Sequence, residues 1–138
     1  MGRSLQIRNA KPKVLVVEDV DDVREMYIEY LEFLGFSAEG AVNGREAVRK
    51  AIAHHQALIV MDLAMPVLDG WEAIRILRAD PRTRKIPIVV LTGQAQPEPL
   101  ARAREVGATE VLTKPCLPAQ LGRVIVNTLA RDGATATN

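Results

Sequence analysis

The chain has 138 residues, 48% hydrophobic and 25% charged, a composition typical of one globular domain. Its 18 Lys and Arg against 17 Asp and Glu give a formal net charge of +1, so the basic field that drives nucleic-acid binding is missing. No stretch reaches the roughly 18 apolar residues of a membrane span, and residues 1–13 lack the apolar run of a signal peptide. One cysteine and two histidines exclude an internal disulfide and a Cys/His zinc site. We therefore expect a cytoplasmic protein with no nucleic-acid or membrane partner.

Five short apolar segments predict the strands of a sheet. Four of them are nearly continuous in apolar residues, which is typical of parallel strands covered by helices on both faces. The second in chain order is weaker. The predicted strands lie at 14–17, 36–39, 57–61, 86–91 and 111–112.

Segments with helical periodicity follow each strand. In the first of these helices the predicted inward residues are Val23, Met26, Tyr27, Tyr30, Leu31 and Leu34. Gly35 and Gly107 stand where the first and fourth helices should end. The predicted helices begin at or just after the N-caps Asp21, Asn43 and Asp69, and after Pro97, Pro99 and Pro118.

The alternation of strand and helix predicts an open, doubly wound α/β fold with right-handed crossovers. A closed eight-stranded barrel needs about 250 residues, so the length excludes it. We expect one domain over 13–131, between a flexible N-terminal segment at 1–12 and a flexible C-terminal tail at 132–138. The short tail leads us to expect no output domain in this chain.

Polar side chains stand at the carboxyl ends of the predicted strands, where doubly wound folds form their binding crevice. Glu18 and Asp19 follow the first strand, and Asp62 follows the third. Thr92 follows the fourth strand and Lys114 the fifth. The fold therefore brings three carboxylates, a hydroxyl and an ammonium to one edge.

These side-chain types suit phosphoryl transfer. Neighbouring carboxylates repel unless a cation offsets their charge, and an all-oxygen ligand set with room for water suits Mg²⁺. Asp62 can then act as a nucleophile and form an acyl phosphate. Lys114 can pair with one phosphoryl oxygen and Thr92 can donate a hydrogen bond to another.

Five motifs, in order and together, resemble the receiver domain of two-component response regulators. They are Val-Leu-Val-Val-Glu-Asp at 14–19, Asp-Leu-Ala-Met-Pro-Val-Leu-Asp-Gly at 62–70, Leu-Thr-Gly at 91–93, Gly-Ala at 107–108 and Thr-Lys-Pro at 113–115. The resemblance covers residues 13–129. It implies a flavodoxin-like (βα)₅ fold with strand order 2-1-3-4-5 and a cis peptide bond between Lys114 and Pro115.

The resemblance also implies the role of each site residue. Asp62 is the expected phosphoacceptor, Thr92 the hydroxyl that follows the phosphoryl group, and Lys114 the phosphate-pairing lysine. Glu18 and Asp19 are the expected acidic ligands of Mg²⁺, together with Asp62 and the backbone carbonyl of Ala64.

The implied function is a stand-alone response regulator that is not an enzyme, beyond assisting its own phosphorylation and dephosphorylation. It would accept the phosphoryl group from a histidine kinase or a histidine phosphotransfer protein. It would then signal to a downstream protein target through the face formed by the fourth helix, fifth strand and fifth helix. A homodimer linked to phosphorylation is a further expected partner.

Two positions depart from the family pattern. Val111 stands three residues before Lys114, where the family often has a switch aromatic, and Cys116 stands where a bulky aromatic is common. The first departure leaves an alternative open, a pseudo-receiver that serves as an interaction or dimerisation module without phosphorylation. Cys116 is expected to be a buried small thiol. A cofactor-dependent enzyme is disfavoured, since no Gly-x-Gly-x-x-Gly or Gly-Lys-Ser/Thr motif occurs.

Three residues near the site have structural interpretations. We expect Asp69 to cap the third helix and Gly70 to allow a close approach of two backbone segments. Trp71, in the first turn of that helix, is expected to be partly exposed packing.

Overall fold

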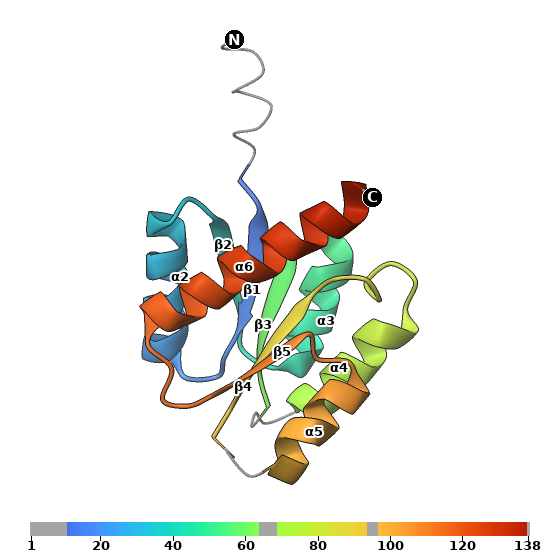
Figure 1. Ribbon diagram of the computed structural model, residues 1–138. Coiled ribbons are helices and arrows are strands. Elements are labelled where there is room, and N and C mark those ends of the chain that lie inside the picture. Colours follow the sequence, from blue (N-terminus) through green and yellow to red (C-terminus); the bar gives the residue numbers. More distant parts are fainter. Residues whose placement is uncertain (1–10, 64–68, 94–96, 138) are drawn as a thin grey trace.

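The computed structural model describes residues 11–63, 69–93 and 97–137, and it contains one five-stranded sheet. All neighbouring strands are parallel and their order is β2-β1-β3-β4-β5, which confirms the predicted fold class and strand order (Figure 1). The strands are β1 (Lys13–Val17), β2 (Ser37–Ala41), β3 (Leu58–Asp62), β4 (Ile88–Thr92) and β5 (Glu110–Thr113).

In the part of the chain that the structure describes, five helices cover the two faces of the sheet. Helices α2 (Asp21–Phe33) and α6 (Pro118–Thr137) lie on one face. The other face carries α3 (Gly44–Ala53), α4 (Gly70–Ala79) and α5 (Pro97–Val106). None of the helices in the described part of the chain is long and apolar enough to cross a membrane.

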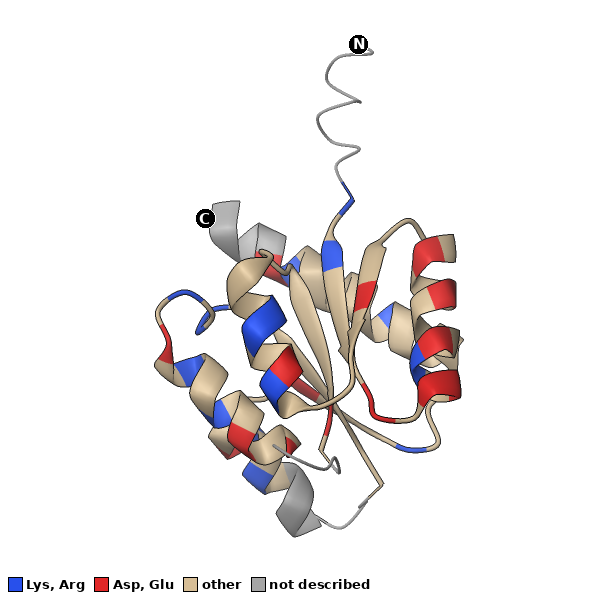
Figure 2. Ribbon diagram, turned by 180° about the vertical axis from the view of Figure 1, so that it is seen from behind, with Lys and Arg blue, Asp and Glu red and all other residues tan. Residues whose placement is uncertain are grey.

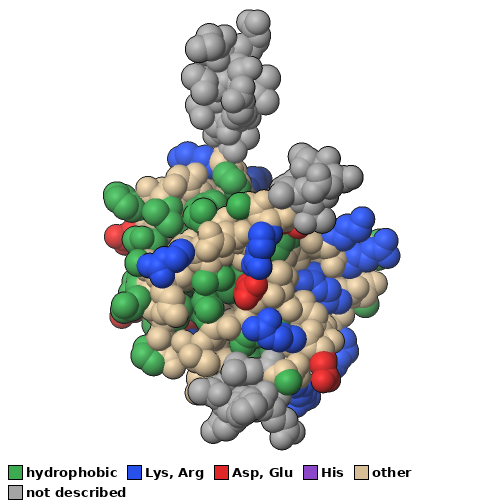
Figure 3. All heavy atoms as spheres, in the orientation of Figure 1, with side chains coloured by type: hydrophobic (Ala, Val, Ile, Leu, Met, Phe, Trp, Pro, Cys, Tyr) green, Lys and Arg blue, Asp and Glu red, His purple; other side chains and the backbone are tan. Residues whose placement is uncertain are grey.

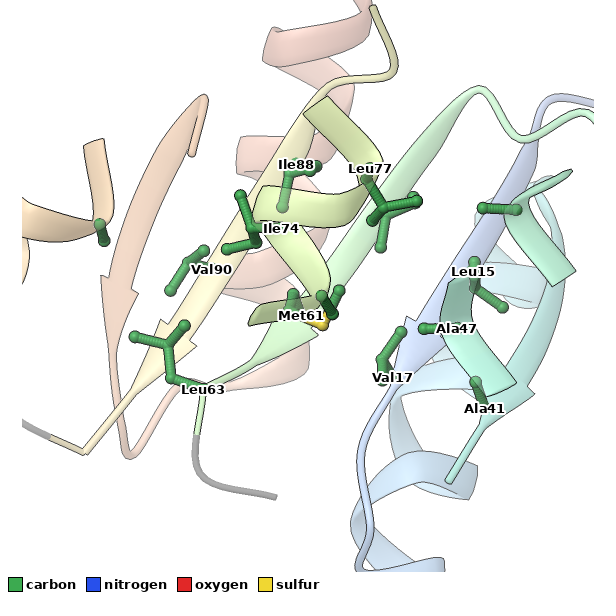
Figure 4. Close-up of a cluster of buried hydrophobic side chains, with 14 residues drawn as sticks. Leu15, Val17, Ala41, Ala47, Met61, Leu63, Ile74, Leu77, Ile88 and Val90 are labelled. Atoms are coloured by element: carbon green, nitrogen blue, oxygen red, sulfur yellow. The ribbon is translucent and has the colours of Figure 1, made fainter. Parts of the chain in front are cut away.

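Alternating residues of the central strands fill two separate apolar cores. Leu15 and Val17 point to the core under α3, α4 and α5, which also holds Ile74 and Leu77 (Figure 4). Val14 and its even-numbered neighbours point to the opposite core under α2 and α6. Burying one Leu, Ile or Val side chain contributes about 1.5–3 kcal/mol to the free energy of unfolding. The two cores therefore hold the strands, and with them the strand ends, in place.

The predicted signals at most helix ends are confirmed. The Asn43 side chain accepts a hydrogen bond from the Glu46 N–H at 2.8 Å, as an N-cap does. At the end of α2, Gly35 has a φ of +104°, and the N–H of Phe36 donates to Leu31 O at 3.0 Å. This pattern closes the helix and turns the chain into β2.

The predicted N-cap at Asp21 is wrong. The N-cap is Val20, which makes no side-chain cap, and Asp21 is the first helical residue. Its carboxylate instead accepts a hydrogen bond from Arg24 at 2.6 Å. An acidic residue still stabilises the first turn there, because the N-terminal end of a helix carries partial positive charge.

Helix α6 continues to Thr137, through most of the segment that the sequence assigns to a flexible tail. No proline follows Pro118, so nothing blocks the backbone hydrogen bonds of the last turns. Gly133, in these last turns, costs only about 1 kcal/mol relative to Ala. The N-terminal segment 1–12 lies, apart from its last two residues, outside the described part of the chain, and the domain limits 13 and 131 stay predictions.

Candidate functional site

Four predicted site residues meet at the carboxyl edge of the sheet. Glu18 follows β1, Asp62 ends β3, Thr92 ends β4 and Lys114 follows β5. The pairing of β1 with β3, β3 with β4 and β4 with β5 places these strand ends side by side. Thr92 is paired with Thr113, so Lys114 comes directly after the last rung of the sheet.

Three carboxylates form a compact cluster at this edge. Glu18, Asp19 and Asp62 each offer an oxygen, and these atoms lie within 4.8 Å of one another. Glu18 and Asp62 are buried, with 2% and 3% exposure, whereas Asp19 is exposed. Burial raises the pKa of Glu18, a hydrogen bond from the Val20 N–H lowers it, and the charge of Asp62 raises it further. The cluster therefore concentrates negative charge where little water screens it.

Lys114 is the cation that contacts this cluster. Its Nζ lies 3.2 Å from Asp62 Oδ2 and 3.3 Å from Glu18 Oε1. Burial of the amine acts to lower its pKa, but the charges of Asp62 and Glu18 outweigh that effect and raise it. Lys114 is therefore charged and holds its place between two carboxylates. The peptide bond between Lys114 and Pro115 is cis, as expected.

Backbone hydrogen bonds hold these residues in place. The Glu18 N–H donates to Ala41 O at 3.0 Å, and the Arg24 guanidinium donates to Glu18 O at 2.8 Å. The Lys114 N–H donates to Thr92 O at 2.8 Å. The side chains of Glu18 and Lys114 therefore extend from backbone segments that are fixed by hydrogen bonds to β2, α2 and β4.

Gly70 brings the start of α4 against the strand that carries Asp62. Its N–H donates to Leu63 O at 3.1 Å. A Cβ at this position would overlap the backbone oxygen of Asp62 and stand 2.7 Å from Leu63 Cα. The predicted close approach is confirmed, and so is the cap by Asp69, whose side chain accepts from the Glu72 N–H at 2.9 Å.

Two predicted residues are less fully placed. Thr92 is buried, with 3% exposure, at the end of the strand beside Asp62. Ala64, whose carbonyl is a predicted metal ligand, lies outside the described residues. Its role stays a prediction.

The carboxylate cluster fits Mg²⁺ by its chemistry. The side chains offer only oxygen atoms, which Mg²⁺ prefers, and they carry more negative charge than Lys114 offsets. Across the described ranges no other group of three His, Cys, Asp or Glu side chains could hold a metal ion.

The sequence did not reveal two contacts near the site. The hydroxyl of Tyr27 on α2 donates to Cys116 O at 2.7 Å, and the bond is buried. The guanidinium of Arg102 on α5 lies 4.7 Å from the ring centroid of Trp71 on α4. Helical periodicity predicted that Tyr27 faces inward, but a pattern within one helix cannot indicate a partner 89 positions away. Cys116 is buried and Trp71 is partly buried, as expected.

Comparison with known proteins gives consistent results. The model of the response regulator receiver domain matches residues 14–126. The transcriptional regulatory protein PrrA of Mycobacterium leprae is 36% identical over 129 residues, which are 94% of this chain and 54% of that protein. The chain thus spans about half the length of the curated relatives it matches.

Solved structures agree in fold. The chemotaxis protein CheY4 of Vibrio cholerae has a TM-score of 0.81 and 35% identity, covering 86% of this chain and 98% of that one. The receiver domain of the sensor histidine kinase PA1611 of Pseudomonas aeruginosa has a TM-score of 0.80 and 31% identity, covering 88% and 99%. That structure has a magnesium ion coordinated in its active site cleft. Taken with the family match over 14–126, these likenesses show that the chain belongs to the response regulator receiver domains, the signalling domains of two-component systems.

Proposed function

We propose that Asp62 accepts a phosphoryl group from a phosphohistidine of a kinase or phosphotransfer protein. The observation that carries this proposal is the position of Lys114 Nζ, 3.2 Å from Asp62 Oδ2 at a buried, carboxylate-rich strand edge. A cation there can pair with the phosphoryl group as it arrives on the carboxylate.

The transfer is an in-line displacement. A carboxylate oxygen of Asp62 forms a bond to phosphorus while the bond from phosphorus to the histidine nitrogen breaks. The imidazole keeps that electron pair, and the product is an acyl phosphate. Lys114 pairs with one phosphoryl oxygen, and the Thr92 hydroxyl donates to another. The same groups assist the later attack of water, so the domain promotes both its phosphorylation and its dephosphorylation.

Glu18, Asp19, Asp62 and the carbonyl of Ala64 would hold Mg²⁺ in this proposal. When bound, the ion supplies positive charge that offsets the carboxylates and the transferring phosphoryl oxygens. The protein contributes the fixed positions of the carboxylates, two of which are buried. Lys114 keeps its own contacts to two of them.

The output surface in the proposal is the face of α5, β5 and α6. Thr92 ends the strand that leads toward α5, so a displacement of Thr92 is transmitted to that helix. Val111 of β5 packs, half-buried, against the core under α5. Valine has few rotamers, so Val111 does not rotate between two positions as a switch aromatic does. In this proposal the displacement of α5 carries the signal.

An exposed surface on α2 supports a protein partner. Figure 2 shows acidic residues repeated along α2, and Figure 3 shows apolar side chains gathered on the same side of the molecule. Phe33 is 81% exposed, and Met26 and Leu34, which were predicted to face inward, are 42% and 40% exposed. An apolar patch beside charged residues is typical of a protein interaction surface.

Intact-mass analysis after incubation with acetyl phosphate and Mg²⁺ tests the proposal. We expect one added phosphoryl group, which is lost when a chelator is present and in Asp62→Asn. Asp132→Asn, which removes an exposed carboxylate on α6, is the matched control and should be modified like the wild type. Modification of Asp62→Asn at another residue would contradict the assignment.

A second candidate function is a phosphorylation-independent interaction or dimerisation module. Val111, in place of the aromatic that the family pattern often has, is the observation that favours it. The absence of any added mass, in folded protein that binds Mg²⁺, would support this candidate.

A further inference from the structure

We propose that Tyr27 is a positioning residue for Lys114, because its hydroxyl fixes the loop that carries the lysine. The inference rests on the proposed function, in which Lys114 pairs with the phosphoryl group on Asp62. Tyr27 itself does not touch the carboxylate cluster in this proposal. It acts through the backbone two residues after the lysine.

The contact joins distant parts of the chain. Tyr27 lies on α2 with 3% exposure, and its hydroxyl donates to the carbonyl oxygen of Cys116 at 2.7 Å. Burial raises the pKa of the Tyr27 phenol, so the group stays a neutral donor. A buried hydrogen bond of this length constrains the loop, since losing it leaves the carbonyl without that partner.

In the described part of the chain, Tyr27 is the only side chain from outside the loop that hydrogen-bonds to the backbone of residues 114–117. On the amino side of the loop the Lys114 N–H donates to Thr92 O at 2.8 Å, so β4 fixes where the loop begins. Pro115 offers no N–H, and Leu117 is 70% exposed. The Tyr27 bond fixes the carbonyl between these two residues. The backbone is therefore held on both sides of Lys114, by β4 at the lysine N–H and by α2 two residues later.

The residue types on the two sides complement each other. Cys116 is small and buried at 5% exposure, at a position where a bulky aromatic is common in the family pattern. The phenol ring of Tyr27 packs in the same core as Cys116, with Leu121 and Ile125 of α6. The aromatic ring of Tyr27 on α2 therefore packs beside the loop, whereas the family pattern often has an aromatic side chain on the loop itself, at the position of Cys116. The hydroxyl adds a directional contact that an apolar side chain would not supply.

The position of the loop determines the position of the amine. Lys114 Nζ contacts Asp62 and Glu18 at 3.2 and 3.3 Å, distances that leave little room for displacement. Hydrogen-bonded pairs of this kind weaken steeply as geometry worsens. A small shift of the Lys114 backbone is therefore expected to slow a reaction that depends on charge placement.

The test compares phosphorylation rates with acetyl phosphate and Mg²⁺, followed by intact mass, in four proteins. They are the wild type, Tyr27→Phe, Lys114→Ala and the double variant. We expect Tyr27→Phe to slow phosphorylation about two- to tenfold, the range that corresponds to one buried hydrogen bond. Its affinity for Mg²⁺, measured by titration, should match the wild type. In the Lys114→Ala background, Tyr27→Phe should cause no further loss.

Tyr30→Phe is the matched control. Tyr30 lies on the same helix, and its hydroxyl makes no hydrogen bond to another residue in the described part of the chain. It should phosphorylate at the wild-type rate.

Each contrary outcome has a distinct meaning. A wild-type rate in Tyr27→Phe would overturn the inference and leave the proposed function intact. An equal loss in both backgrounds, weaker Mg²⁺ binding, or failure of Tyr27→Phe to fold would show a general structural role and would also overturn it. A wild-type protein that takes no phosphoryl group would overturn the proposed function, and the inference with it.

Discussion

A methyl group added at Gly70 tests how closely α4 must approach the strand that carries Asp62. The Cβ of Gly70→Ala would overlap the backbone oxygen of Asp62 and lie 2.7 Å from Leu63 Cα. Both obstacles are backbone atoms, so no side chain can rotate away. The first turn of α4 and the end of β3 must therefore move apart.

The magnitude follows from two opposing effects. Overpacking of this kind costs about 1–3 kcal/mol, and the obstacle here favours the upper part of that range. Replacing glycine by alanine in a helix contributes up to about 1 kcal/mol in the other direction. We expect a net loss of about 2 kcal/mol. With an unfolding entropy of about 2.1 cal/mol/K per residue, 138 residues convert this loss to a fall in Tm of about 7 °C.

Urea unfolding and thermal unfolding measure the loss, and intact mass after acetyl phosphate treatment measures the effect on Asp62. We expect slower phosphorylation of Gly70→Ala at a temperature where it is fully folded, because Asp62 shifts relative to Lys114. Gly93→Ala is the control, since a Cβ there meets nothing within 4 Å, and its stability should stay within about 0.5 kcal/mol. Wild-type stability and rate in Gly70→Ala would refute the reasoning.

Three further predictions address other contacts. Lys114→Ala should bind Mg²⁺ like the wild type in calorimetry but lose the phosphorylation-linked NMR shifts of α5; shifts that persist would contradict its role. Burial acts to raise the pKa of Glu39, but hydrogen bonds from His54, at 2.9 Å, and from Gln56 outweigh it and lower that pKa. The stabilisation is therefore present above the unfolded value near 4.5 and is lost as pH falls through the folded pKa, so Glu39→Gln should flatten the acid side of a plot of unfolding free energy against pH. An unaltered acid limb would count against this contact. Arg102→Ala should uncover Trp71, the single tryptophan, and shift its fluorescence maximum to longer wavelength, at a cost below about 1 kcal/mol; an unchanged spectrum would contradict the contact.

The order of elements was predictable because the buried strands are continuous in apolar residues and the helices are not. The segment at 14–17 has no alternation, and in the structure its residues are divided between two cores. The same argument located β1, β3, β4 and β5 to within a few residues, whereas the segment of β2 is less apolar and gave a weaker signal. The sequence pattern did not locate the start of α2 correctly, because Asp21 has the residue type of an N-cap and the choice between N-cap and first turn depends on local geometry. It also failed for Met26 and Leu34, since periodicity does not say how wide the covered face of a helix is.

The convergence of the site was predictable for a topological reason. The carboxyl ends of parallel neighbouring strands lie at one edge, so residues 18, 62, 92 and 114 had to meet once the strand order was known. Their separate environments were not predictable. Glu18 is buried and Asp19 is exposed although they are adjacent, because the Glu18 N–H continues the sheet by donating to Ala41. The contact from Tyr27 to Cys116 joins two elements whose relative placement appears only in the folded chain.

The charge arrangement also explains why the fold and the proposed chemistry depend on each other. Burial raises the pKa of Glu18, which means that the ionised carboxylate costs folding free energy. Two apolar cores offset this cost, and Lys114 offsets part of the charge. Any cation that binds the folded cluster and not the unfolded chain stabilises the fold by mass action. In the proposed chemistry, the same excess of negative charge that destabilises the fold would attract Mg²⁺, and a domain whose edge had been neutralised for stability would lose that attraction.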